Sequence, residues 1–289
     1  MKFPIFSLIF TVFLFWLTTQ ISASYEEYLS YIFILTIGII HGSNDISLIK
    51  VVRKREKLSI KYLLFYIGLV FLNTIAFLVS PILALVLFVL ISCYHFGEQH
   101  FHHQIKELNI LSRLLFLSYG ILIFGLLFYF NSDHTSLIIN DLIAYALTEH
   151  QFLWFLGAGI ISTLLFYGLN FKNFKTGSNH FQEVFLILLF AILFKLAALL
   201  WAFAIYFVVW HSIPSLRDQI KVLYGESTKI GIMQYIKSSL MYWLISIFGL
   251  TLLYFATRYY QVNFVTVFFA FLAAITVPHV IVMYFLNKN

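Results

Sequence analysis

Cysteine and charged residues are scarce in this chain of 289 residues. Cys93 is the only cysteine, which excludes internal disulfides and metal sites built from several thiolates. Only 10% of the residues are charged, whereas 62% are hydrophobic, and no soluble domain of this size has such a balance. The sequence also lacks an internal repeat, a low-complexity linker and a soluble domain. It is therefore the sequence of an integral membrane protein.

Apolar runs of about twenty residues recur along the whole chain, and each can cross a hydrocarbon layer of about 30 Å at about 1.5 Å per residue. We expect one all-α domain over residues 1–289, a polytopic transmembrane helical bundle with about 8–10 spanning helices. The expected spans lie near residues 3–22, 28–49, 62–79, 81–97, 113–130, 152–170, 238–257 and 262–286, with more in 182–213. Residues 1–24 also resemble a signal peptide, but their length favours an uncleaved signal anchor.

Positive charges gather in short loops between the apolar runs, so the formal net charge of +6 indicates membrane orientation and not a nucleic-acid partner. The loop 50–61 carries six positive charges against one negative charge, which predicts a cytoplasmic location. The side of the membrane on which each other loop lies follows from this location. The acidic stretches face outward, with Glu26, Glu27, Asp133, Asp141 and Glu149. The basic stretches face inward, with Lys106, Arg113, Lys172 and Lys175.

The block 182–213 allows two interpretations, because only Glu183 and Lys195 interrupt about thirty apolar positions. A single helix would be about 45 Å long, which exceeds the thickness of the hydrocarbon layer. A hairpin of two short helices is the alternative. The hairpin places the basic loop with Arg217 and Lys221 in the cytoplasm, so the charge pattern favours it.

Ten histidines are present, and four of them lie within apolar runs or at their ends: His41, His95, His211 and His279. Ionisable residues inside spans are costly and are candidates for function. With the hairpin topology, all four lie in the cytoplasmic half of their helices. We therefore expect a metal site in that half of the bundle, although each histidine alone could equally be a packing residue.

Neutral imidazoles suit Fe, Zn, Cu and Ni, and polar neighbours favour such a site. Asp45 follows His41 by one helical turn and could accept the other ring N–H, and Glu98 follows His95 by three positions. Asn44 would support the same site, unless Asn44 and Asp45 only satisfy helix ends. Pro214 and Pro278 would bend or end the helices beside His211 and His279.

The sequence is also rich in aromatic residues, with 34 Phe and 18 Tyr. Such residues could line a tunnel for a long apolar substrate, or they could form belts at the membrane interfaces. Tyr206, Phe207 and Trp210 are candidates for substrate binding because they precede His211 on one short helix.

Four short motifs carry a resemblance to a known family: H-G-x-x-D at residues 41–45, Y-H-F-G at 94–97, W-H-S-x-P at 210–214 and P-H at 278–279. The order of these motifs, together with the length and hydropathy of the chain, resembles that of the Brp/Blh family of membrane-bound carotenoid-cleaving dioxygenases. The resemblance implies an oxidoreductase that uses ferrous iron, Fe(2+), and O₂ to cleave β-carotene at its central double bond, giving two molecules of retinal. It also implies a multi-pass protein of the cell inner membrane and a retinal-binding rhodopsin as a possible consumer of the product.

The same resemblance implies that His41, His95 and His211 are iron ligands. The family commonly has a second histidine one helical turn after the third motif, where this chain has Ser215. His279 is the expected replacement because of its depth, and His100 or Glu98 are the alternatives.

Other functions remain open from the sequence. A metal- or proton-coupled transporter could use the four histidines together with Asp45, Glu98 and Lys195 as intramembrane charges. A bis-histidine haem protein could use two pairs of histidines at one depth. A di-iron desaturase needs several histidine boxes, and only the segment 100–103 resembles one.

Overall fold

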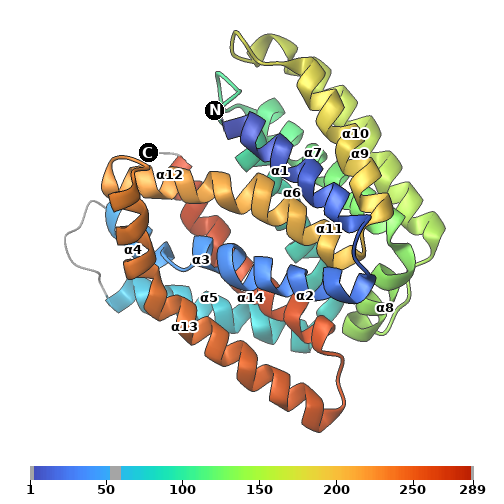
Figure 1. The fold of residues 1–289 in the computed structure, drawn as a ribbon, viewed down its shortest axis with the longest axis vertical. Coiled ribbons are helices and arrows are strands. Elements are labelled where there is room, and N and C mark those ends of the chain that lie inside the picture. Colours follow the sequence, from blue (N-terminus) through green and yellow to red (C-terminus); the bar gives the residue numbers. More distant parts are fainter. Residues whose placement is uncertain (1–2, 53–59, 288–289) are drawn as a thin grey trace. The chain divides into compact units, whose positions relative to one another are not determined.

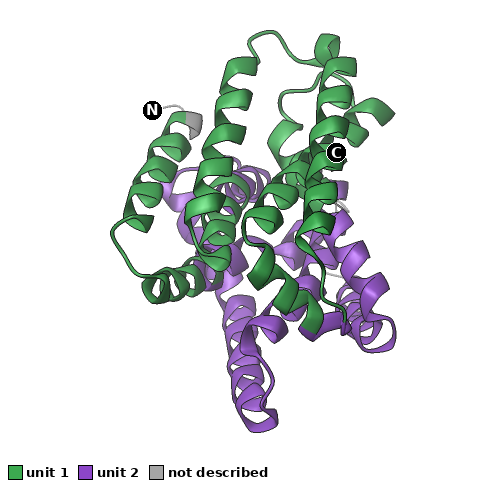
Figure 2. Ribbon diagram, turned by 90° about the vertical axis from the view of Figure 1, so that its right-hand side faces the viewer, with its two compact units in different colours: residues 1–34, 92–140, 145–211 green, residues 35–91, 141–144, 212–289 purple. Residues whose placement is uncertain are grey.

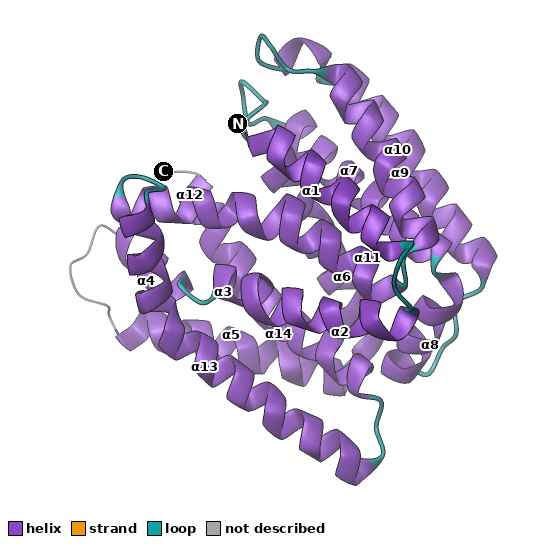
Figure 3. Cartoon of the chain, in the orientation of Figure 1, coloured by secondary structure: helices purple, strands orange, loops and turns teal. Residues whose placement is uncertain are grey.

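The structure is a computed structural model that describes residues 3–52 and 60–287, and helices are the only regular elements in these ranges (Figures 1 and 3). Eight of the described helices are long and apolar enough to cross a membrane. The prediction of an all-α bundle with about 8–10 spans is therefore confirmed. Residues 53–59, the centre of the predicted cytoplasmic loop, lie outside the described residues.

The chain divides into two compact units, which are coloured separately in Figure 2. Unit 1 contains residues 1–34, 92–140 and 145–211, and unit 2 contains residues 35–91, 141–144 and 212–289. Each unit is built from segments that lie far apart in the sequence.

Unit 1 is built from α1 (Phe3–Thr18), α2 (Ala23–Phe33), the second half of α6 (Pro81–Phe101), α7 (Ile110–Phe130), most of α8 (Ser132–Ile143), α9 (Glu149–Leu169), η2 (Phe171–Asn173), α10 (His180–Leu196), α11 (Leu199–Tyr206) and most of the π-helix η3 (Phe207–Ser212). Helix α7 packs along α9, and α11 packs against α2. Helix α8 was not expected, because its polar sequence predicted a loop.

Two glycines allow α6 and α7 to approach closely. A Cβ at Gly97 would overlap the backbone of Phe116, and a Cβ at Gly120 would overlap the backbone of Cys93. Small residues at such points let two membrane helices bring their backbones together. The contact fixes the C-terminal turns of α6, which carry the Y-H-F-G motif.

The block 182–213 contains two helices, as the charge pattern predicted. Helix α10 ends at Leu196, and α11 begins at Leu199. The backbone N–H of Ala198 donates a hydrogen bond of 2.7 Å to Oε2 of Glu26, so a side chain of α2 supports the break. Beyond α11 the helical segment continues through η3 into α12 and does not end at Pro214. Pro214 occupies the first turn of α12, where proline is tolerated.

Unit 2 is built from most of the π-helix η1 (Ile34–Gly38), α3 (Ile39–Gly42), α4 (Asp45–Val52), α5 (Ile60–Val79), the first half of α6, α12 (Ile213–Tyr224), α13 (Lys229–Tyr260) and α14 (Phe264–Asn287). Helix α14 packs along α5 and also contacts α13, α4 and α3. Pro278 lies inside α14 and does not end it.

The span expected at 28–49 is interrupted. The π-helix η1 precedes α3, and a turn at Ser43 and Asn44 separates α3 from α4. This interruption lies inside the H-G-x-x-D motif, so His41 and Asp45 belong to different helices.

Large apolar side chains face outward from both units. Phe181 and Ile161 in unit 1 are 89% and 70% exposed, and Leu78 and Met241 in unit 2 are 80% and 69% exposed. An aqueous surface would not present so many large apolar groups, whereas lipid is an apolar solvent for them. The exposed surface therefore agrees with an integral multi-pass membrane protein.

Candidate metal centre

His41 is buried in α3, directly after the wide turn of η1. Its Nδ1 is hydrogen-bonded to the carbonyl oxygen of Gly38, which is the last residue of η1. A neutral imidazole has one N–H and one lone pair, so this bond makes Nδ1 the donor and leaves the lone pair on Nε2. π-Helical turns are rare, and they occur often at functional sites.

His279 is buried in α14 of the same unit, next to His41. The two rings meet edge to face, with centroids 4.8 Å apart. Nδ1 of His279 lies 2.8 Å from Oδ1 of Asp45, which accepts a hydrogen bond from Nδ1–H, so the lone pair is again on Nε2. In both histidines of unit 2 the lone pair is thus on Nε2, which is the ring atom that could bind a metal.

His95 and His211 form a second buried pair, within unit 1. Their rings are 4.7 Å apart and nearly perpendicular. His95 comes from α6 and His211 from the π-helix η3. Phe96 and Phe207 lie against the His211 ring, with centroid distances of 4.5 and 5.5 Å. This pair therefore has an apolar surround.

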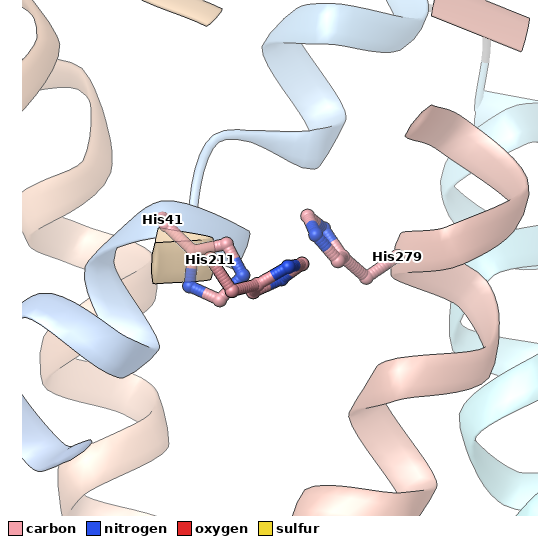
Figure 4. A group of neighbouring side chains, drawn as sticks. All are labelled: His41, His211 and His279. Carbon is pink, nitrogen blue, oxygen red and sulfur yellow. The ribbon is translucent and has the colours of Figure 1, made fainter. Parts of the chain in front are cut away.

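In unit 2, His41 and His279 are buried neighbours that could bind a metal ion together; Figure 4 draws their side chains and that of His211, which belongs to unit 1. His41 and His279 each offer one ring nitrogen, and these two nitrogens lie within 4.8 Å of each other. Two imidazole nitrogens that bind one ion at about 2.1 Å each are at most about 4.2 Å apart, a separation of similar size. The donor set is neutral and free of thiolates, which fits the metals that imidazole prefers.

Asp45 differs from its expected position. The sequence pattern placed it on the face of His41, whereas the structure places it against His279. The turn at Ser43 and Asn44 is the cause, because it breaks the helical register that the spacing assumed. The second carboxylate oxygen of Asp45 accepts a hydrogen bond of 2.9 Å from the hydroxyl of Tyr66.

Asn44 and Glu98 are both buried, as expected for residues near a site. The side-chain amide of Asn44 donates to the carbonyl oxygen of Tyr235 at 3.1 Å, which links the α3–α4 turn to α13. Glu98 accepts a hydrogen bond of 3.3 Å from the hydroxyl of Tyr94 on its own helix. Their roles at a metal site stay predictions.

His100, the alternative ligand, contacts a carboxylate in unit 1. Its Nε2 lies 2.6 Å from Oε2 of Glu183, and its ring stacks on Tyr119 at 4.6 Å. Gln104 donates to the other oxygen of Glu183 at 3.0 Å. Metal binding by His100 stays a prediction.

Ser215 occupies the position where a further histidine was expected, and it belongs to a buried polar network of unit 2. Its hydroxyl accepts from the amide of Gln219 at 3.0 Å, and Gln219 accepts from the hydroxyl of Tyr235 at 2.7 Å. The Tyr235 hydroxyl is also 3.2 Å from the carbonyl oxygen of His41. The network therefore supports the backbone of a histidine, a role that no local sequence pattern indicated.

The three predicted substrate-binding aromatics all pack against other aromatic side chains of unit 1. Phe207 stacks on His211. Tyr206 packs edge-on against Phe190, and the indole N–H of Trp210 donates to Thr11 of α1 at 2.8 Å. Substrate binding by the three residues stays a prediction, and Phe207 is the one that contacts a candidate ligand.

Buried histidines in a bundle of apolar helices define a multi-pass membrane protein with a candidate metal centre. The family model described as "Beta-carotene 15,15'-dioxygenase" matches residues 32–287, so the chain belongs to this family. The resemblance found in the four motifs is thereby confirmed. No curated protein and no solved structure matches the chain. The family indicates an oxidoreductase that acts on a carotenoid with O₂, and this favours a dioxygenase over a transporter or a haem protein.

Proposed function

We propose that this protein is an iron-dependent membrane dioxygenase that cleaves β-carotene at its central double bond and releases two molecules of retinal. The observation that carries the proposal is the buried histidine pair of unit 2, His41 and His279, both of which lie within the range matched by the family. Membership of the family supplies the reaction class, and the histidines supply a place for the metal.

His41, His95, His211 and His279 are the proposed ligands. Support for His41 and His279 comes from their Nδ1 hydrogen bonds, which orient the rings and leave Nε2 for the metal. Support for His95 comes from its contact with His211. In this proposal His279 replaces the imidazole that is absent at Ser215.

The residues around the histidines fit an apolar substrate. Ferrous iron, when bound by neutral imidazoles, supplies the chemistry needed to use O₂ on an electron-rich polyene. The chain itself has to orient one double bond and exclude water. Phe96 and Phe207, which lie against the His211 ring, are suited to both tasks because they offer flat apolar contacts. Because β-carotene dissolves in lipid, we expect it to arrive laterally from the bilayer.

We also propose an inner-membrane location with the metal site in the cytoplasmic half, on the basis of the charged loops. Helix α1 would remain attached as an uncleaved anchor. Its Thr11 and Thr18 accept hydrogen bonds of 2.8 and 2.9 Å from the indoles of Trp210 and Trp201, so unit 1 uses α1 as a packing element. A rhodopsin that takes up the retinal would be a suitable partner.

The test is expression in a bacterium that produces β-carotene, followed by chromatography of the pigments and metal analysis of the purified protein. We expect β-carotene to be consumed, retinal to appear and iron to copurify. Unchanged β-carotene in cells with well-inserted protein would refute the reaction. An absorption spectrum adds a check, because a strong Soret band would indicate haem.

Single replacements of the proposed ligands test the site. His41→Ala, His95→Ala, His211→Ala and His279→Ala should each lose most of the iron and the activity while the chain still inserts. His134→Ala is the matched control, because His134 is an exposed histidine of α8. If all four variants retain full iron, the metal is bound elsewhere.

A further inference from the structure

Three helices of unit 2 are joined by two consecutive hydrogen bonds through a single carboxylate. The Tyr66 hydroxyl of α5 donates to Oδ2 of Asp45 at 2.9 Å, and Nδ1 of His279 in α14 lies 2.8 Å from Oδ1. Asp45 begins α4 and is only 1% exposed. Each carboxylate oxygen therefore has its own donor, and the two donors come from two different helices, α5 and α14.

This arrangement constrains the direction of the His279 ring. A carboxylate held by one donor alone can rotate about its side-chain bonds, whereas two donors on opposite oxygens fix its plane. A fixed plane in turn fixes the line along which Nδ1–H of His279 donates, and so the direction of the lone pair on Nε2. The Tyr66 hydroxyl is the part of this chain of contacts farthest from the ring.

We propose that Tyr66 is a positioning residue for His279 and acts through Asp45. The inference rests on the proposed function, because it takes His279 to be a metal ligand. The Tyr66 hydroxyl donates to Asp45, so its effect on His279 is to hold that carboxylate in place. Mutation of a group that supports a metal ligand in this way typically lowers metal affinity by about 10 to 100-fold.

The setting of Tyr66 allows its hydroxyl to be tested separately from its ring. The half-buried ring lines an apolar groove together with Phe65, Leu69 and Pro278, and the hydroxyl points to the buried Asp45. Tyr66→Phe keeps the ring in the groove and removes only the hydrogen bond. Leu69→Ala changes the wall of the same groove and leaves the bond to Asp45 intact.

The experiment is a titration of metal-free protein in detergent with Co²⁺, read from its visible ligand-field spectrum, and with Fe²⁺. Tyr66→Phe should weaken binding of both metals by about 10-fold or more and should change the Co²⁺ spectrum. Leu69→Ala and Tyr242→Phe, a half-buried tyrosine of α13, are the controls and should bind like the wild type. Gel filtration and thermal melting of the metal-free proteins identify any variant that fails to fold.

A double-mutant cycle with Asp45→Asn tests whether Tyr66 acts through Asp45. Because the two residues belong to one network, the double variant should bind metal about as weakly as Asp45→Asn alone. Full additivity, or a folded Tyr66→Phe variant with wild-type affinity and spectrum, would overturn the inference. If the wild-type protein binds metal but leaves β-carotene intact, the proposed reaction is refuted and the role of Tyr66 still stands. If the wild-type protein binds no metal, the proposed reaction and the role of Tyr66 are both overturned.

Discussion

Substitution of Gly97 by alanine should separate α6 from α7 and lower the stability of unit 1. A Cβ at this position would lie 2.6 Å from the backbone carbon and 2.8 Å from the Cα of Phe116, and it would be closer still to the carbonyl oxygen. Carbon atoms pack at about 3.5–4.0 Å, so the helices would have to move apart by about 1 Å. The obstructing atoms are backbone and cannot rotate away. We expect a loss of about 3 kcal/mol, the upper end of the usual range for overpacking, which is about a hundredfold in the folding equilibrium.

The control is the same substitution at Gly157 of α9, where an added Cβ has no neighbour within 4 Å. Gly157→Ala should leave stability unchanged or raise it, because alanine favours a helix by up to about 1 kcal/mol over glycine. The assay is fluorescence-detected gel filtration after heating in detergent, which gives an apparent melting temperature for each variant. Equal melting temperatures for Gly97→Ala and Gly157→Ala would show that the close approach of α6 and α7 does not exist.

Two further substitutions test the supports of the histidine helices. Glu26→Ala should destabilise the protein by about 1–3 kcal/mol in the same melting assay, because the N–H of Ala198 loses its carboxylate acceptor at the start of α11. Glu27→Ala is the control, since Glu27 is exposed. Equal effects of the two substitutions would contradict this role of Glu26. Ser215→His should not improve iron binding, because the fully buried Ser215 contacts Gln219 and an imidazole would overpack that network. Higher iron content in folded Ser215→His protein, measured by metal analysis, would contradict this.

The architecture was predictable because hydropathy determines where a chain enters lipid. Runs of apolar residues predicted the spanning helices, and the basic residues after Trp210 predicted two helices in the block 182–213. The polar segment of α8 was missed, because the same criterion assigns polar stretches to loops. The interruption at Ser43 and Asn44 was missed as well, since its few polar residues are averaged with the apolar ones around them.

The histidines were predictable, but the contacts between them and their supports were not. An imidazole in an apolar run is conspicuous, and the buried histidines His41, His95, His211 and His279 were identified in this way. Spacing along a helix assigned Asp45 to His41, and this failed because the helix ends between them. Tyr66 is one of 18 tyrosines and lies 21 residues from Asp45, so only the folded chain distinguishes it from the others.

The direction in which His41 and His211 point depends on the number of residues in the two π-helical segments. A π turn contains about one residue more than an α turn, and each residue advances an α-helix by about 100°. Without that extra residue in η1 or η3, the side chains of His41 or His211 would be turned by about that angle relative to the preceding helix. The gain or loss of a single codon in either segment can therefore exchange which side chain faces inward, even though no histidine is itself replaced.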